Sequence, residues 1–317
     1  MINKSSPIAV ASRSFTKSKE LRQRLEQNFD SVKYNEELLH FDEESLITFL
    51  NGSEAAIISE DKITKRVIDG TPGLKIVSKF GVGLDGIDLE YLKEKNIVLG
   101  WKPGVNASSV AELALSYIIL LLREAYQLNR EMLNSNWKKV SNSRDLSGMK
   151  IGIIGFGHIG KKLADYFSIH ESEVLVYDPL IDQKEKISDF IELTSLEFLL
   201  ENSDAISIHI PLLDSTRGLI GKNEISKMKK GSVLVNLSRG GIVDESSIYK
   251  ALRTNHLSGA AFDVFENEPI NSEKFNSRLL ELNNFFATPH IAGTSNQTIQ
   301  KLGVSAINCL IDECQDC

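Results

Sequence analysis

The chain has 317 residues, of which 42% are hydrophobic and 25% are charged, and its formal net charge is −7. This length exceeds one ordinary hydrophobic core, so we expect two domains, and the composition is that of a folded chain rather than a disordered one. The negative charge offers no basic face to a phosphate backbone, which argues against a nucleic-acid partner.

The first hundred residues alternate short apolar runs with polar helical patterns. This alternation is typical of a parallel sheet with helices on its faces. No apolar run of signal-peptide length is present near the N-terminus, so we expect a cytoplasmic protein. We predict strands at 8–10, 55–58 and 76–78, helices at 21–29 and 63–68, and a glycine-containing turn at 81–83.

Residues 106–130 predict one long helix, because Asn106 or Ser108 can cap its start and Glu112 lies in its first turns. The most apolar segment, 110–122, has 13 residues and is too short to cross a bilayer, so we expect no membrane partner. A helix that is apolar on nearly every face has to be covered on all sides, by both domains or by a second subunit.

A second alternating region begins at residue 150 and predicts another parallel sheet. The expected fold is therefore α/β, with two doubly wound parallel-sheet domains. The apolar runs that mark the strands of the second region are 150–154, 174–177, 205–208, 232–236 and, near its end, 285–287.

The first strand of this region leads into Gly155-Phe156-Gly157-His158-Ile159-Gly160, which a predicted helix follows. This arrangement is typical of dinucleotide binding. Gly155 permits a tight turn, Gly157 lets the pyrophosphate approach the backbone, and Gly160 lets the helix pack on the strand, while the helix N-terminus attracts the phosphates. Asp178 ends the next strand, 18 residues after Gly160. Its carboxylate can accept hydrogen bonds from the adenosine ribose and repels a 2′-phosphate, so we expect NAD rather than NADP.

Three later motifs carry residues suited to keto-acid chemistry. Arg239 follows a predicted strand and can bind a carboxylate through two planar contacts. His290 can donate a proton in reduction and accept one in oxidation, because imidazole titrates near neutral pH. Glu268 can hydrogen-bond the imidazolium and raise its pKa. These three residues are the predicted catalytic set.

The order and spacing of these motifs resemble the D-isomer-specific 2-hydroxyacid dehydrogenases, over nearly the whole chain. The resemblance implies a Rossmann-type NAD domain at 103–289 and a discontinuous, flavodoxin-like substrate domain at 1–102 and 290–317. It also implies that the 106–130 helix links the domains and builds a homodimer. The last helix, roughly 295–311, is expected to return to the first domain.

The resemblance assigns further residues to the cofactor site. Asp263 is expected to hold the nicotinamide carboxamide, and the loop that follows the strand at 205–208 is expected to lie beside the cofactor. Besides the three glycines and Asp178, the expected cofactor residues are His158, Ile159, His209, Pro211, Thr216, Leu237, Ser238, Asp263 and Gly293.

The expected substrate is a small 2-hydroxy or 2-keto acid, bound by Arg239 and by the turn at 79–85. In that turn, the Val82 and Gly83 N–H groups can form a nest for the carboxylate, and Lys79 can add charge for a phosphate. Residues 57–61 lack the arginine that many phosphoglycerate dehydrogenases place there. The substrate therefore stays open among 3-phosphoglycerate with its keto form, hydroxypyruvate and glyoxylate.

The same motifs also bear on two alternative functions. The related formate dehydrogenases carry glutamine at the position of Glu268, so that activity is disfavoured. An NAD-sensing, corepressor-like binding protein stays open, because this fold also serves such proteins and a fold alone does not determine function.

Three cysteines, Cys309, Cys314 and Cys317, lie near the end of the chain. Cys314 and Cys317 have CxxC spacing, but no second pair of ligands accompanies them, as a zinc site of this kind requires. We therefore expect reduced thiols and no metal.

Overall fold

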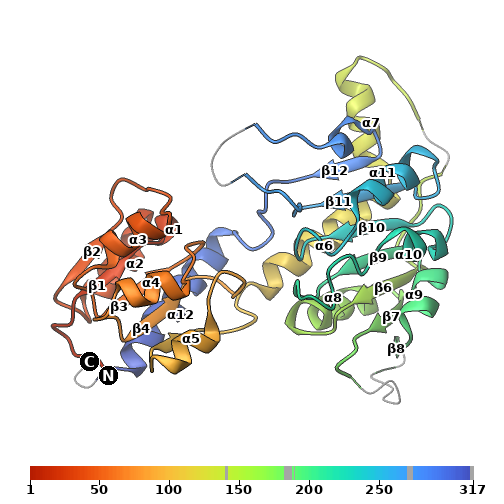
Figure 1. Ribbon diagram of the computed structural model, residues 1–317. Helices are drawn as coiled ribbons and strands as arrows, with labels where there is room; N and C mark the ends of the chain where they lie inside the picture. Colours follow the sequence, from red (N-terminus) through yellow and green to blue (C-terminus); the bar gives the residue numbers. More distant parts are fainter. Residues whose placement is uncertain (140–141, 182–187, 189, 270–273, 315–317) are drawn as a thin grey trace. The chain divides into compact units, whose positions relative to one another are not determined.

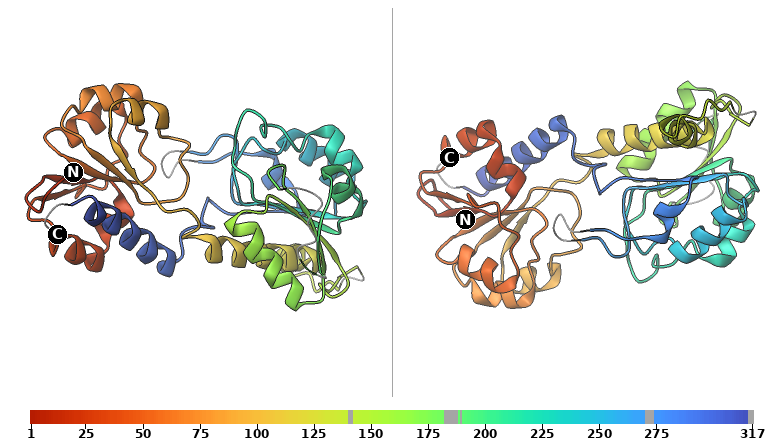
Figure 2. Two further views of the ribbon diagram at one scale, coloured as in Figure 1. Left: turned by 90° about the horizontal axis from the view of Figure 1, so that it is seen from below. Right: turned by 90° about the horizontal axis from the view of Figure 1, so that it is seen from above.

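The computed structural model describes residues 1–139, 142–181, 188, 190–269 and 274–314. The chain divides into two compact units, Met1–Asn106 with Thr294–Cys317, and Ala107–Gly293 (Figure 1, Figure 2). Each junction lies four residues beyond the boundary predicted at 102 or 289. Residues 290–292 stay with the second unit because their N–H groups all bond to Asp263.

The discontinuous unit holds five parallel strands: β1 (Ile8–Val10), β2 (Val32–Tyr34), β3 (Ala55–Ile58), β4 (Ile76–Lys79) and β5 (Val98–Gly100). Its helices are α1 (Arg13–Lys17), α2 (Lys19–Glu26), α3 (Glu43–Leu50), α4 (Lys65–Gly70), α5 (Leu89–Glu94) and α12 (Asn296–Asp312). The strand order β2-β1-β3-β4-β5 is that of flavodoxin-like sheets, as predicted.

Alternation of side chains along β1 gives this sheet its two covered faces. Ile8 and Val10 pack into a core with α1, α2 and α12, whereas Ala9 packs into a core with α3, α4 and α5. The C-terminal helix α12 therefore completes the hydrophobic core of the N-terminal unit, which makes that unit discontinuous in sequence (Figure 1).

The second unit holds seven parallel strands: β6 (Lys150–Ile154), β7 (Glu173–Tyr177), β8 (Ile191–Leu193), β9 (Ala205–Ile208), β10 (Val233–Asn236), β11 (Gly259–Phe262) and β12 (Phe285–Ala287). Its helices are α6 (Ala107–Leu122), α7 (Ala125–Leu133), α8 (His158–Ile169), α9 (Leu196–Asn202), α10 (Lys222–Lys227) and α11 (Glu245–Arg253), with a 3₁₀ turn at Arg278–Glu281.

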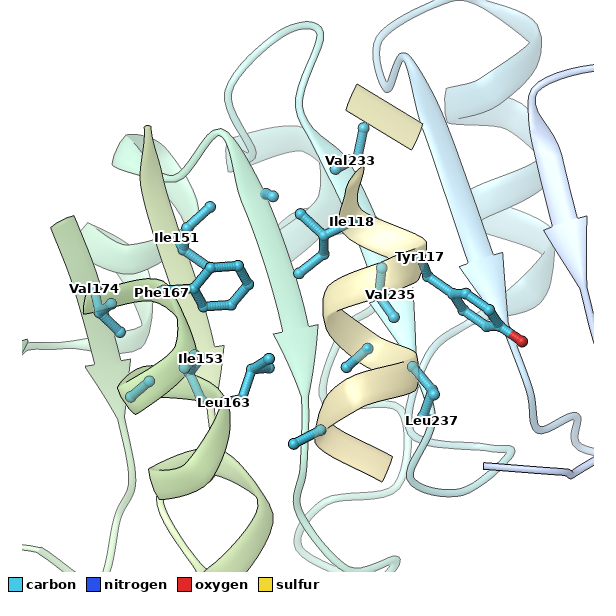
Figure 3. Packing of buried hydrophobic residues seen from close by; sticks show 14 of the residues in the cluster. Tyr117, Ile118, Ile151, Ile153, Leu163, Phe167, Val174, Val233, Val235 and Leu237 are labelled. Carbon is cyan, nitrogen blue, oxygen red and sulfur yellow. The ribbon is translucent and has the colours of Figure 1, made fainter. Parts of the chain in front are cut away.

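The order of the seven strands, β12-β11-β10-β9-β6-β7-β8, reverses direction between β6 and β9. In such sheets, ligands bind at the carboxyl ends of the strands beside this switch point. Helices α6 and α8 cover one face through residues such as Ile118 and Phe167, which pack with Ile151, Val174 and Val235 of the strands (Figure 3). Helices α9, α10 and α11 cover the other face.

The single helix predicted at 106–130 is wrong, because the structure has two helices, α6 and α7, with a break at Arg123–Glu124. Glu124 has a left-handed backbone (φ 50°) and donates its N–H to Leu121, which ends α6. Nor is α6 enclosed on every side within this chain: Ile119 is 39% exposed.

The described residues include no helix long and apolar enough to span a membrane, and no cluster of three His, Cys, Asp or Glu side chains suited to a metal. Cys309 is a free cysteine, whereas Cys314 is disulfide-bonded, so the expectation of reduced thiols is wrong for Cys314. Cys317 lies outside the described residues.

Candidate active site

The glycine-rich turn lies at the end of β6, and the space around each of its glycines differs. Gly155 has φ +99°, and a Cβ on it would lie 2.5 Å from the His209 carbonyl oxygen. A Cβ on Gly160 would lie 2.0 Å from the Gly155 carbonyl oxygen, which allows α8 to start directly against the turn. A Cβ on Gly157 would meet nothing within 4 Å. Backbone atoms of the protein therefore fill the space beside Gly155 and Gly160, whereas the space beside Gly157 is open.

Helix α8 begins at this turn with features of an anion site. Its N-cap is Gly157, which has no side chain to cap the first N–H groups of the helix. These N–H groups and the positive end of the helix dipole suit a pyrophosphate. His158, the first helical residue, is exposed, and Ile159 packs against the core under the helix.

Asp178 is tied directly to the glycine-rich turn. One carboxylate oxygen accepts the Phe156 backbone N–H (2.7 Å) and the other accepts the Leu180 N–H (2.9 Å). Strand β7, which precedes Asp178, pairs with β6 along its whole length. The structure therefore places the acid beside the turn, where a carboxylate can meet the ribose of a dinucleotide.

The predicted histidine loop follows β9 on the other side of β6. The His209 ring is buried, which lowers its pKa to about 3, so it is neutral at physiological pH. Its Nε2 lies 2.9 Å from Ser207 Oγ, and its Nδ1 is buried without a hydrogen-bond partner. The Thr216 hydroxyl donates to the Pro211 carbonyl (2.7 Å) and accepts the Leu213 N–H (2.8 Å), which closes the loop.

The loop after β10 carries Arg239, and the buried side chain of Asn236, which is not among the predicted site residues, supports this loop. Asn236 donates to the Arg239 carbonyl (3.0 Å) and accepts the Ser238 N–H (3.1 Å). The Ser238 hydroxyl donates to Ile208 at the end of β9 (2.7 Å), and the Leu237 side chain lies in the core at 6% exposure. For Leu237 this leaves mainly the backbone for a cofactor contact.

Gly240 brings the Arg239 loop against the loop that carries Glu268. A Cβ on Gly240 would lie 1.9 Å from the Phe265 carbonyl oxygen, so only glycine fits this approach. The Phe265 N–H in turn donates to Glu268 Oε1 (2.9 Å). Arg239 is close enough for its charge to act on both Glu268 and His290. The structure therefore brings the three predicted catalytic residues together.

Glu268 and His290 form a hydrogen-bonded pair, with Oε2 and Nδ1 2.7 Å apart, which is an ion pair when the imidazole is protonated. The hydrogen bond to Glu268 raises the pKa of His290, against an opposing effect of burial. Burial favours the protonated form of Glu268, but its hydrogen bond and charge interaction with His290 prevail and lower its pKa. Since Nδ1 is bound to Glu268, Nε2 is the nitrogen left for a substrate. About half of the imidazole side chain (49%) is exposed.

Asp263, the expected nicotinamide residue, is 0% exposed, and its carboxylate accepts hydrogen bonds from groups of the protein itself. It accepts the N–H groups of Ile291 and Ala292 (both 2.8 Å) and the Thr288 hydroxyl. Gly293, the last residue of this unit, is half-buried. Thr288, two residues before His290, is not among the predicted site residues.

The predicted substrate turn belongs to the discontinuous unit. The Lys79 ammonium donates to the Ser59 carbonyl, and the Val82 carbonyl accepts the Trp101 indole N–H (3.1 Å). Gly81 has φ +148°, and Gly83 is half-buried. Burial raises the pKa of the Asp61 carboxyl next to this turn, and the Lys79 charge opposes that effect.

A parallel sheet with a glycine-rich turn at its switch point, an acid beside that turn and a Glu–His pair beside an arginine are the features of a nicotinamide-dependent dehydrogenase. Comparison with known proteins agrees. Residues 115–292 match the family model of the D-isomer specific 2-hydroxyacid dehydrogenase NAD-binding domain. The chain belongs to this family and is an NAD-dependent oxidoreductase.

Two curated relatives and one crystal structure illustrate the similarity. The chain is 33% identical over 276 residues to hydroxypyruvate reductase of Thermotoga maritima, covering 86% of this chain and 89% of that one. It is 35% identical over 263 residues to D-3-phosphoglycerate dehydrogenase of Archaeoglobus fulgidus, covering 82% of this chain but only about half (49%) of that longer protein. The D-lactate dehydrogenase of Aquifex aeolicus, complexed with NAD and lactic acid, superposes with a TM-score of 0.82 at 28% identity, covering 96% of this chain and 94% of that one.

Proposed function

We propose that the chain catalyses reversible hydride transfer between NADH and a small 2-keto acid, with Arg239, Glu268 and His290 as its catalytic residues. The contact between His290 Nδ1 and Glu268 Oε2 (2.7 Å) is the observation that carries this proposal. A carboxylate that raises the pKa of an imidazole provides a proton donor suited to reduction near neutral pH.

The bound cofactor supplies the hydride, which adds to the keto carbon of the substrate. His290 gives its Nε2 proton to the keto oxygen, so the product is a neutral hydroxyl group and the imidazole is left neutral. Glu268 accepts the hydrogen bond from Nδ1–H throughout and so fixes the orientation of the ring. Arg239 binds the substrate carboxylate, and oxidation runs through the same steps in reverse.

The turn at 155–160 and the N-terminus of α8 would hold the pyrophosphate of NAD, and Asp178 would hold its adenosine ribose. Both Asp178 oxygens already accept backbone N–H groups, which orients the carboxylate for the ribose hydroxyls. Pro179 and Leu180, the next residues, carry no positive charge for a 2′-phosphate. The 209–216 loop, residues 237–238, Asp263 and Gly293 complete the proposed cofactor site.

We propose that Arg239 binds the substrate carboxylate and that, in the discontinuous unit, the Val82 and Gly83 N–H groups are substrate-binding donors. Among the candidate substrates, hydroxypyruvate has the support of the Thermotoga maritima relative, which covers nearly the same length as this chain. 3-Phosphohydroxypyruvate remains a candidate because the relatives named D-3-phosphoglycerate dehydrogenase are about as similar. The cytoplasmic location stays a prediction.

We further propose a homodimer built on α6 and α7. The outer side of these helices exposes Ile119 (39%), Met132 (51%) and Leu133 (77%). Exposed apolar side chains of this kind are typical of interaction surfaces.

The deciding experiment is NADH oxidation measured against hydroxypyruvate, glyoxylate, 3-phosphohydroxypyruvate and 2-ketoglutarate. We expect turnover with at least one of them, with NADH preferred to NADPH, and the highest kcat/KM identifies the substrate. A flat trace with every acid, together with tight NADH binding, would instead support the NAD-sensing protein.

A further inference from the structure

His290 has a backbone conformation that residues other than glycine rarely adopt. Its φ of 54° lies in the left-handed region, which is strained for an L residue. Such strain persists only where the surrounding contacts determine the conformation. The His290 N–H donates to the carbonyls of Asp263 (2.8 Å) and Thr288 (3.1 Å). These two hydrogen bonds fix the backbone N–H group of the strained residue.

The buried Asp263 carboxylate holds the chain on both sides of His290. It accepts the Thr288 hydroxyl on one side and the N–H groups of Ile291 and Ala292 on the other. Hydrogen bonds to a carboxylate are about twice as strong as those between neutral groups. A single side chain therefore ties residues 288–292 into one loop.

Helix α6 adds a second layer to this arrangement. The Tyr117 hydroxyl lies 2.7 Å from Thr288 Oγ1, and the Ser109 hydroxyl donates to the Ala292 carbonyl (2.8 Å). Because the one Thr288 hydroxyl proton goes to Asp263, Tyr117 must be the donor in its bond to Thr288. Figure 3 shows the Tyr117 hydroxyl directed away from the apolar side chains around α6. Burial raises the pKa of Tyr117, which keeps the donor proton in place.

We propose that Asp263, Thr288, Tyr117 and Ser109 are positioning residues, which act on proton transfer by holding the His290 imidazole against Glu268. The proposal rests on the proposed function, because it assumes that His290 is the proton donor. In this proposal the hydrogen bonds that Asp263 accepts from Thr288, Ile291 and Ala292 have a role separate from nicotinamide binding. Helix α6 supports the loop that carries His290.

Loosening the loop has a defined electrostatic consequence. The charged groups that act on His290 are Glu268 and Asp263, which raise its pKa, and Arg239, which lowers it. The hydrogen bond to Glu268 is the largest of these effects and depends on the short Nδ1–Oε2 contact. A displaced loop lengthens that contact, so the pKa of His290 falls toward its ordinary value.

The test uses the full-length protein with Tyr117→Phe and Thr288→Val, which leave the Asp263 carboxylate in place. Thr288→Ser keeps the hydroxyl and serves as the rescue variant. Tyr126→Phe is the matched control, because the rings of Tyr117 and Tyr126 both pack edge-on against Phe286 at 5.0 Å. NMR titration gives the pKa of His290, steady-state kinetics give kcat and the KM for NADH, and thermal melts verify folding.

We expect Tyr117→Phe and Thr288→Val to lower the pKa of His290 and to reduce kcat at least about tenfold, since a misplacement of 1 Å can cost roughly 100-fold. The KM for NADH should stay unchanged, and Thr288→Ser should restore both values. A histidine pKa and kcat equal to those of Tyr126→Phe would overturn the proposal. Weaker NADH binding with an unchanged histidine pKa would also overturn it. The NMR titration needs no substrate, so it decides the point even if no keto acid is reduced.

Discussion

The pKa of His290 reflects a balance between residues that the fold brings together. Glu268 and Asp263 stabilise the imidazolium, and Arg239 destabilises it. A substrate carboxylate bound to Arg239 screens the arginine charge, so we expect the pKa of His290 to rise further when a keto acid binds. The substrate then favours the protonated histidine that its own reduction requires.

Replacing Glu268 with glutamine should lower the pKa of His290, because an amide cannot stabilise the imidazolium as a carboxylate does. Oxidation needs neutral histidine, so the acidic limb of its kcat/KM profile should move to lower pH. Reduction needs protonated histidine, so the basic limb of its profile should move to lower pH as well. A coupling of about one pKa unit corresponds to roughly 1.4 kcal/mol and is readily measured.

Glu266→Gln provides the control, since Glu266 is an exposed carboxylate on the same loop. Its pH profiles should match those of the wild type. Glu268→Gln profiles that also coincide with the wild type would show that the pair does not set the pKa of the proton donor.

At the level of structural elements, two glycines of the turn after β6 should have different roles. We expect Gly157 to matter for cofactor binding and Gly160 for the stability of the fold. Gly157→Ala should leave the melting temperature unchanged, because its Cβ enters open space, while the added methyl group keeps the pyrophosphate away from the turn. Gly160→Ala should destabilise the protein by about 1–3 kcal/mol, because its Cβ would strike the Gly155 carbonyl.

The two variants are compared by thermal melting and by titration with NADH. We expect NADH affinity to fall about tenfold or more in Gly157→Ala without a loss of stability. Full NADH affinity in Gly157→Ala would place the pyrophosphate elsewhere.

For the whole molecule, the exposed side of α6 and α7 predicts concentration-dependent behaviour. Ile119→Glu should convert a dimer to a monomer in light scattering, because a buried unpaired carboxylate is costly in an interface. Its melting temperature should also lose any dependence on protein concentration. Ile169→Glu is the control, because Ile169 is an exposed apolar residue (78%) at the end of α8. Equal masses for both variants would argue against this interface.

Most of the strands, and the residues that meet in the candidate active site, were predictable because their signals are local. Buried parallel strands such as β1, β3, β6 and β9 are short continuous apolar runs, and the glycine-rich turn follows one of them directly. Strands β2, β5, β8 and β11 were not predicted. Of these, β2 and β8 are each three residues long with a charged middle residue, Lys33 or Glu192. Both lie at sheet edges, where one side of the strand is unpaired and polar residues are tolerated.

Other features depend on contacts between distant parts of the chain and have no local signal. The Tyr117–Thr288 hydrogen bond spans 171 residues, and the Ser109–Ala292 bond spans 183. The left-handed backbone at His290 is accompanied by hydrogen bonds from its neighbours Ile291 and Ala292 to the buried Asp263 carboxylate. The break at Glu124 interrupts a stretch whose sequence pattern predicts one continuous helix. Residue types and their order therefore indicate the proposed chemistry, whereas the orientation of the His290 imidazole depends on long-range hydrogen bonds that form only when the sheet and α6 have packed.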